Sequence, residues 1–233
     1  MCGRFTLASD LGQFLSLFDV DAPPELEHPR QYNIAPSQPV VGLVADPHTR
    51  LEVMEWGFLP TWSRPGSDAR TVINARVESL EEGKPYFRGA FRSARCIIMA
   101  DGFYEWKKER GGKRPFHIGL KKKGVFGFAG LWSMPHESDG THRATCAIIT
   151  LPANDFMRDI HDRMPAILRP SDLERWIDPK TPSRELFKVL EPYPSEEMTA
   201  HEVGVLVNNP RNDVPECIRP IDEGEDAPAG DRA

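Results

Sequence analysis

The second residue of the chain, Cys2, is placed where a cysteine can do chemistry that no other residue type offers. If Met1 is removed, Cys2 carries a free α-amine beside its thiol, which together form a 1,2-aminothiol. The unperturbed pKa values, about 8 for the amine and about 8.5 for the thiol, leave both groups partly nucleophilic near neutral pH. This pair condenses with an aldehyde to an imine and then closes to a five-membered thiazolidine. While Met1 is present the amine is in a peptide bond and the chemistry is forbidden. The alternative is that a cysteine stands at this position by chance.

Two further residues are candidates for moving protons. Glu105 lies between Tyr104 and Trp106, and aromatic neighbours are expected to desolvate the carboxyl and raise its pKa. His161 is expected at the end of a short helix, where an imidazole can protonate a leaving oxygen near pH 7. The alternatives are an ordinary strand glutamate that faces water and a structural histidine.

Three residues are candidates for binding rather than for proton transfer. Asn74 and Arg76 flank Ala75 at a strand exit, and an amide beside a guanidinium suits a sugar or phosphate oxygen. Trp62, in a proline-containing loop, is expected to be exposed and could stack on an unpaired base. The alternatives are a capped turn with a surface arginine, and a tryptophan that fills the core.

Charge and cysteine usage limit the function classes. The net charge is -6, but residues 222–233 contribute -4 of it, whereas residues 92–123 hold ten Lys or Arg against three acids, a net of +7. A local basic face of this kind is compatible with a phosphate backbone, although it could equally be a solvated hairpin. The four cysteines show no CxxC pair or metal-ligand spacing, and no dinucleotide or phosphate-loop motif is present, so neither a metal nor a cofactor is expected. Cys96 and Cys146 lie in apolar runs and are expected to be buried thiols in a reducing cytosol. No apolar run is long enough to span a membrane, and the N-terminus lacks a signal-peptide pattern, which predicts a soluble, unsecreted protein.

The elements that must position these residues are mostly short strands. Strands are predicted at 3–7, 40–45, 51–56, 95–100, 104–107, 114–120, 125–132, 143–150 and 203–207. Residues 21–38 are expected to be irregular. Helices are predicted after Ser9 and at 153–160, 171–177 and 183–190, with Ser9, Ser171 and Ser183 as caps. Hairpin-length links and the absence of a βαβ rhythm favour one α+β domain, with a β-rich, largely antiparallel, barrel-like core flanked by short helices. The domain is expected over residues 2–221, followed by an acidic, disordered tail at 222–233.

Several segments, taken in order, resemble the SRAP family, the SOS response-associated peptidases or abasic-site processing proteins. The segments are Met1-Cys2-Gly3-Arg4-Phe5, Tyr32-Asn33-Ile34-Ala35-Pro36, Trp56-Gly57, Ile73-Asn74-Ala75-Arg76-Val77-Glu78, residues 100–107 (ADGFYEWK), residues 160–165 (IHDRMP) and residues 207–213 (VNNPRND). The resemblance covers residues 2–221. No single motif is specific, but the combination is.

The resemblance implies a single α+β domain with a groove for single-stranded DNA, and no cofactor. Cys2 would become the N-terminus after self-processing and form a covalent thiazolidine with the ring-opened aldehyde of an abasic site. Asn74 would hold the sugar or the amine, Glu105 would move protons, and His161 would assist opening of the deoxyribose. Arg76 and Arg163 match positions that bind DNA phosphates, and Arg4 and Trp62 complete the predicted DNA-binding set. The protein is expected to act as a cytoplasmic monomer, associated with the nucleoid if bacterial.

Two other functions remain open from the sequence. An N-terminal nucleophile amidohydrolase or peptidase would use the Cys2 thiol on an acyl carbon with its own amine as base. A non-catalytic single-stranded DNA-binding module would use the basic residues alone.

Overall fold

The computed structural model describes residues 2–20, 30–45, 48–63, 71–134 and 144–221. Five strands form its central layer: β3 (Pro39–Ala45), β4 (Thr49–Trp56), β6 (Arg95–Ala100), β9 (Phe126–Ser133) and β10 (Thr145–Pro152). They pair in the order β10-β4-β3-β6-β9, and β9 also pairs with β10, so the ring is closed. Only the β4–β10 pairing within this ring is parallel. The predicted barrel-like, largely antiparallel core is therefore confirmed, and we call these five strands the barrel.

Burial on both faces of strands β6 and β9 stabilises the barrel. Every residue of β6 and every residue of β9 is buried, as the continuous apolar runs in the sequence require. Glycine lets these two strands approach closely, since a Cβ at Gly130 would lie 2.7 Å from Cys96 Sγ. Two short strands, β5 (Asn74–Arg76) and β11 (Arg163–Pro165), extend the sheet by pairing with β10.

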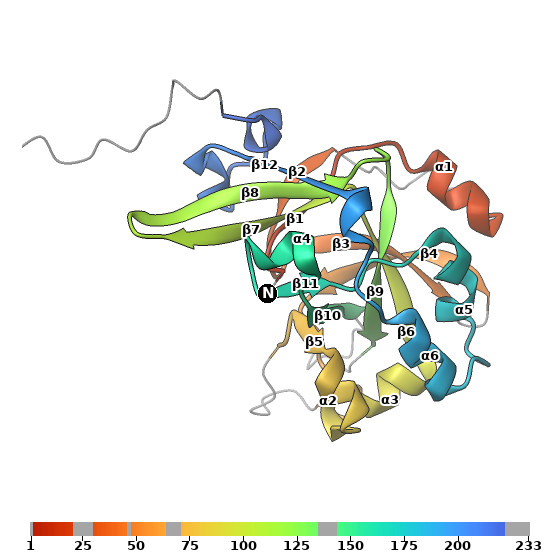
Figure 1. Cartoon of the computed structure of the whole chain (residues 1–233). Coiled ribbons are helices and arrows are strands. Elements are labelled where there is room, and N and C mark those ends of the chain that lie inside the picture. Colours follow the sequence, from red (N-terminus) through yellow and green to blue (C-terminus); the bar gives the residue numbers. More distant parts are fainter. Residues whose placement is uncertain (1, 21–29, 46–47, 64–70, 135–143, 222–233) are drawn as a thin grey trace, which may run out of the picture.

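A second sheet of five strands packs against the barrel, and we call it the outer sheet. Its order is β12 (Met198–Glu202), β8 (Gly112–Leu120), β7 (Gly102–Glu109), β1 (Phe5–Leu7) and β2 (Gln31–Ile34). Phe5 joins the two sheets, with ring centroids 5.0 Å from Trp56 and 5.8 Å from Phe128. Strands β7 and β8 form a long hairpin that projects from the body (Figure 1). Glu109 pairs with Gly112 across its turn, as the predicted Gly111-Gly112 turn requires.

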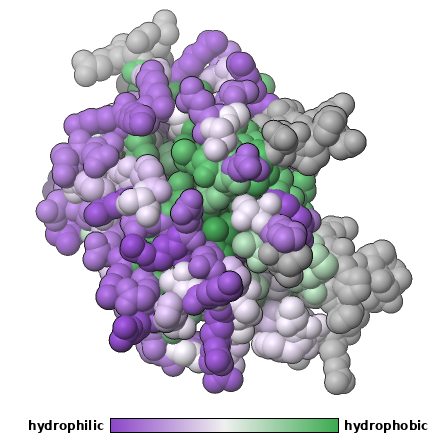
Figure 2. All heavy atoms as spheres, turned by 90° about the vertical axis from the view of Figure 1, so that its right-hand side faces the viewer, coloured by the Kyte–Doolittle hydropathy of each residue, from purple (hydrophilic) through white to green (hydrophobic). Residues whose placement is uncertain are grey.

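Short helices surround the two sheets. They are α1 (Gly12–Leu15), α2 (Val77–Glu81), α3 (Pro85–Ser93), α4 (Asp155–Arg158), α5 (Leu173–Ile177) and α6 (Ser183–Val189), with 3-10 turns at 16–18, 170–172, 195–197, 205–208 and 215–218. Viewed from the side on which α1 and α5 lie, polar side chains surround an apolar area (Figure 2). Within the described ranges no helix is long and apolar enough to cross a membrane.

Several local predictions are wrong, and each error has a physical cause. Residues 31–34, expected to be irregular, form strand β2 because they pair with β1 at the sheet edge. The apolar run 203–207 was predicted as a strand, but residues 205–208 form a 3-10 turn, and the strand is instead the polar segment β12, which pairs with β8. None of the three predicted serine caps accepts a capping bond: the capping positions are Leu11, Asp172 and Pro182. Helix α4 is shorter than predicted, and the side chain of Asn154 caps it. The predicted tail, residues 222–233, lies outside the described residues.

Candidate active site at the N-terminus

Cys2 lies just before strand β1 and is fully buried. Its backbone carbonyl accepts a hydrogen bond of 2.8 Å from Nδ2 of Asn74. Asn74 is itself held in place because β5 pairs with β10, with Asn74 opposite Ile148. Burial raises the pKa of the Cys2 thiol well above its usual range, and the negative charge of Glu105 raises it further. The structure thus brings three of the predicted residues, Cys2, Asn74 and Glu105, into one site.

Glu105 points into the protein and not into solvent. It lies in β7 and is only 3% exposed, which excludes an ordinary strand glutamate facing water. Burial raises the pKa of its carboxyl, while the nearby His161 acts in the opposite direction. A carboxyl with a raised pKa holds its proton to a higher pH than an exposed one, which suits it to giving and taking a proton, as the flanking aromatic residues predicted.

His161 follows α4 and directs its imidazole to Glu105, with 3.8 Å between His161 Nε2 and Glu105 Oε2. Its other nitrogen, Nδ1, lies 3.0 Å from the backbone N–H of Arg163 and 2.9 Å from Oδ1 of Asp162. Both contacts cannot be hydrogen bonds at once, because the N–H needs a lone pair on Nδ1 and the carboxylate needs a proton there. The backbone N–H is fixed at the start of β11, whereas the Asp162 side chain is largely exposed. We therefore assign the proton of the neutral imidazole to Nε2, the nitrogen nearest Glu105.

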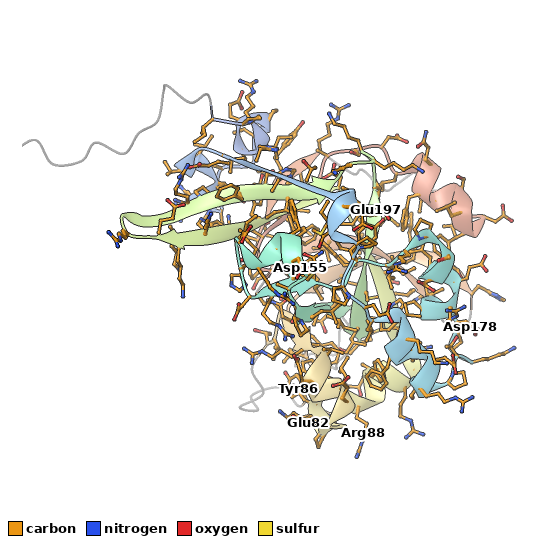
Figure 3. The ribbon with its side chains drawn as sticks, in the orientation of Figure 1. Glu82, Tyr86, Arg88, Asp155, Asp178 and Glu197 are labelled. Atoms are coloured by element: carbon orange, nitrogen blue, oxygen red, sulfur yellow. The ribbon has the colours of Figure 1, made fainter. Side chains whose placement is uncertain are left out.

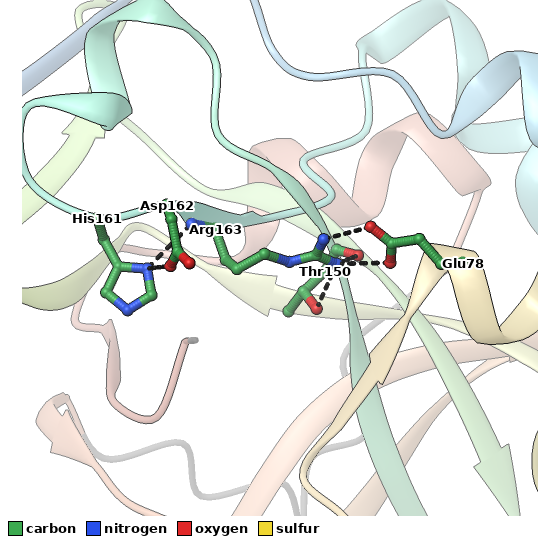
Figure 4. A network of polar contacts seen from close by, with 5 residues as sticks. All are labelled: Glu78, Thr150, His161, Asp162 and Arg163. Carbon is green, nitrogen blue, oxygen red and sulfur yellow. Dashed lines mark hydrogen bonds and ion pairs between the residues drawn. The ribbon is translucent and has the colours of Figure 1, made fainter.

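Arg163, predicted to bind DNA, has its guanidinium engaged within the protein (Figure 4). It forms a two-bond ion pair with the carboxylate of Glu78 from α2, one of whose contacts is 3.0 Å, and donates to the carbonyl of Thr150 at 2.7 Å. The Arg163 side chain is 13% exposed. Arg163 therefore contacts α2 and β10 through its side chain and the imidazole of His161 through its backbone N–H.

The remaining predicted residues are Arg76, Trp62 and Arg4. Arg76 ends β5 with an exposed side chain, one residue beyond the buried Ala75. Trp62 is 60% exposed, which excludes a core-filling role, and packs edge-on against Tyr86 of α3 at 5.9 Å. Figure 3 shows Tyr86, with Glu82 and Arg88, at helices α2 and α3 near the bottom of the view. Arg4 is partly buried and donates from Nη1 to Asn33 and to the carbonyl of Val207.

Buried polar atoms without partners gather in the predicted site residues. Among the described residues, Nε of Arg4, Oδ1 of Asn74 and Nε of Arg163 are buried and find no hydrogen-bond partner. Buried polar atoms are otherwise almost always satisfied, so such atoms point to a bond that forms with another molecule. In the part of the chain that the structure describes, no cluster of three or more metal-ligating side chains occurs.

The predicted basic face is smaller than the sequence suggested. Arg95 is 3% exposed and binds backbone carbonyls of residues 91, 92, 176 and 178, so it belongs to the core. Arg114 pairs with Glu109 and Glu202. The exposed positive charges that remain on the hairpin include Lys108, Arg110 and Lys113.

The sequence alone predicts no role for Asn33 and Glu78, although both contact site residues. Each belongs to a motif that contributed to the family resemblance, and that membership is the one signal that could have found them. Their partners, Arg4 and Arg163, are 29 and 85 residues away along the chain. Spacing alone could not reveal such contacts.

Comparison with known proteins adds a family and a fold. The family model "SOS response associated peptidase (SRAP)" matches residues 1–210. The abasic site processing protein YoqW of Bacillus subtilis is 42% identical over 222 residues, covering 94% of this chain and 99% of that protein. The abasic site processing protein YedK of Escherichia coli is 32% identical over 228 residues, covering 95% and 100%. A crystal structure of a protein from Bacteroides thetaiotaomicron superposes with a TM-score of 0.84 over 94% of this chain and 100% of the other, at 23% identity. This last likeness concerns the fold.

Proposed function

Since this chain belongs to the SOS response-associated peptidase family, we propose that it processes abasic sites in DNA, by binding single-stranded DNA and linking Cys2 covalently to the lesion. The observation that carries the proposal is the meeting of Cys2, Asn74, Glu105 and His161, which come from four separate segments. An aminothiol, an amide, a carboxyl with a raised pKa and an imidazole are the groups that condensation with an aldehyde requires.

The proposed reaction has two steps. The neutral α-amine of Cys2 attacks C1′ of the ring-opened sugar, and the resulting carbinolamine loses water to give an imine. The protonated carboxyl of Glu105 gives the proton with which the hydroxyl leaves. The Cys2 thiol then adds to the carbon of this imine, whose nitrogen still carries its proton; the thiol proton passes to the Glu105 carboxylate, and the ring nitrogen is left as a neutral N–H. The sum is amine, thiol and aldehyde going to thiazolidine and water.

His161 and Asn74 assist these steps in different ways. With its proton on Nε2, neutral His161 can donate to a sugar oxygen and so help to open the deoxyribose ring. Asn74 fixes the Cys2 backbone through Nδ2, and its buried Oδ1 is left to accept from the amine or the sugar. Holding the reactants in this way can lower a barrier by roughly 7–11 kcal/mol.

The proposed DNA contacts surround the reactive residue. Arg4, Arg76 and Arg163 supply positive charge for phosphates, and Trp62 offers an exposed ring for an unpaired base. For Arg163, a phosphate would have to approach a guanidinium that Glu78 already neutralises. We propose a cytoplasmic monomer that requires no cofactor and removes its own Met1.

A cross-linking experiment tests the proposal. The purified protein, with loss of Met1 verified by intact mass, is incubated with single-stranded DNA containing one abasic site and run on a denaturing gel. We expect a slowly migrating covalent complex with the wild-type protein. Cys2→Ala should yield no stable complex, because its amine can form at most an imine, which borohydride reduction would trap.

The matched control is Cys146→Ala, which removes another fully buried thiol and should cross-link at the wild-type rate. Absence of a shifted band from protein that has lost Met1 would refute the proposal. DNA binding without a band would favour the non-catalytic module, and turnover of small amides by the Cys2 thiol would favour the amidohydrolase.

A further inference from the structure

Two of the family motifs, residues 32–36 and 207–213, have no role in the proposed chemistry, and they meet at the side chain of Asn33. Asn33, in β2, is 1% exposed. Its Nδ2 donates to three backbone carbonyls of the segment 205–213, namely those of Val207 (3.2 Å), Asn209 (3.1 Å) and Asn212 (2.7 Å). We call this segment the C-terminal clamp. One buried amide thus holds a stretch of chain that has no strand pairing of its own.

The other end of the same amide holds Arg4. Oδ1 of Asn33 accepts from Arg4 Nη1 at 2.7 Å, and the same Nη1 donates to the carbonyl of Val207 at 2.9 Å. Burial lowers the pKa of Arg4, so its charge depends on good acceptors, and these two supply them. The guanidinium also lies over the ring of Trp106 at 5.9 Å.

Arg4 is two residues from the reactive cysteine. Its backbone carbonyl accepts from the amide of Tyr104 at 2.9 Å and lies 3.9 Å from Cys2 Sγ. Tyr104 directly precedes Glu105 in β7. The position of Arg4 therefore sets where the chain enters the site and how Cys2 faces Glu105.

Further polar bonds hold the clamp in place. Oδ1 of Asp213 accepts from the backbone amides of Tyr32 and Asn33. Oδ1 of Asn208 accepts from Trp106 Nε1 at 2.7 Å. The apolar contribution is one small cluster, in which Val207, the buried residue of the 3-10 turn at 205–208, packs with Tyr104, Val203 and Cys217. Directional bonds, and not a large apolar area, fix the clamp.

We infer that Asn33 is a positioning residue for Cys2: it ties the C-terminal clamp to Arg4 and thereby holds the reactive N-terminus against Glu105. The consequence of this positioning for the reaction rests on the proposed function. Its first test, however, needs no DNA.

The four cysteines of the chain report on the inference separately. Asn33→Leu keeps the branched shape of the side chain and removes every bond of the amide, leaving the clamp carbonyls and Arg4 without the Asn33 partner. The protein is treated with iodoacetamide, and alkylation of each cysteine is followed by mass spectrometry of its peptide. We expect the rates at Cys2 and at Cys217, which bonds to the clamp at Asn212, to rise by roughly tenfold, the size of effect expected when a buried hydrogen-bonding group loses its partner.

Cys96 and Cys146 are the internal controls. Both are fully buried in the barrel and should keep their wild-type rates. A rise at all four cysteines would mean general unfolding, and a rise at Cys217 alone would mean that Asn33 holds the clamp without positioning Cys2. Either result overturns the inference. Asn33→Asp is a milder variant, because it keeps the acceptor toward Arg4 and removes the donors to the clamp; it should raise the rate at Cys217 more than at Cys2.

A double-mutant cycle on cross-linking then connects the inference to the reaction. If Asn33 acts through Arg4, Asn33→Leu should slow cross-linking at saturating DNA in the wild-type background and have no further effect in an Arg4→Ala background. Additive effects would overturn the inference. If even the wild-type protein formed no cross-link, the proposed function would fail, while the alkylation pattern would still decide the positioning of Cys2.

Discussion

The barrel and the outer sheet each bury a thiol beside a carboxylate, and we propose a reaction for only one of the two thiols. Cys146 in β10 and Cys2 before β1 are both fully buried. The pKa of each thiol is raised first by burial and then by a carboxylate, Glu55 for Cys146 and Glu105 for Cys2. Burial and a nearby charge therefore do not by themselves make a reactive cysteine.

The surroundings of the two thiols differ. Cys146 is in a strand paired on both sides inside the closed barrel, where apolar residues dominate. Cys2 lies at the start of the chain, where its backbone is held by an amide and its neighbouring carboxyl faces an imidazole. Directional polar bonds fix the site, and apolar area fixes the barrel. Substitutions of the polar side chains of the site should thus affect the outer sheet more than the barrel, whose own buried polar anchor is Arg95.

The largest expected effect comes from substituting Glu105, compared with the same substitution at Glu55. Glu105→Gln should slow cross-linking by roughly 100-fold or more, since a glutamine cannot transfer a proton. Glu55→Gln, the equivalent change beside Cys146, should leave the rate unchanged. The measurement is the single-turnover rate of cross-link formation as a function of pH. Because the pKa of Glu105 is raised by burial, the wild-type pH profile should include its titration above the usual carboxyl range, and the Glu105→Gln profile should lack it. Equal rates for both variants would remove the distinction between the two sites.

A half-buried histidine of the outer sheet is expected to make the fold sensitive to acid. His117 of β8 lies against Thr6, Tyr104 and His201, and a Cβ at Gly102 would be 2.2 Å from its Nε2, so glycine makes room for the ring. Burial lowers the pKa of His117 to about 4; His201 lowers it further, and Asp101 opposes the shift.

The second prediction follows from the sign of that shift. A pKa depressed in the folded state contributes stability above the unfolded value of about 6.5, and this contribution is lost as pH falls toward 4. We expect wild-type unfolding free energy to fall by about 2 kcal/mol more over this window than that of His117→Gln. Hydrogen exchange should locate the loss in β7, β8 and β12 and not in the barrel strands, none of which contains a histidine. Equal acid loss in the two proteins would contradict the prediction.

Prediction from the sequence was also more successful for the barrel than for the outer sheet. The apolar runs of β6 and β9 identify barrel strands because burial there is continuous. The outer sheet was predicted less well: β12 was missed because it is short and holds few β-branched or aromatic residues, and 205–207 was misassigned because an apolar run does not reveal that Val205 is 71% exposed. Chemistry-bearing residues such as Cys2 and Glu105 are visible by type and neighbours. The amide of Asn33 is not, because its role depends on partners some 174–179 residues away.

The smallest expected effect concerns the surface. Val53 on barrel strand β4 and Trp62 in the loop that follows this strand are both exposed apolar side chains, 48% and 60% respectively. Trp62→Ala should weaken single-stranded DNA binding by about 1 kcal/mol, the lower end of what stacking on one base contributes, whereas Val53→Ala should have no effect. Binding measured over a range of salt concentrations separates stacking from charge: Trp62→Ala should leave the salt dependence unchanged, whereas Arg76→Ala should reduce its slope by about one phosphate contact. A reduced slope for Trp62→Ala would mean that the ring acts by placing charged neighbours, and an unchanged affinity would mean that DNA reaches Cys2 without passing over it.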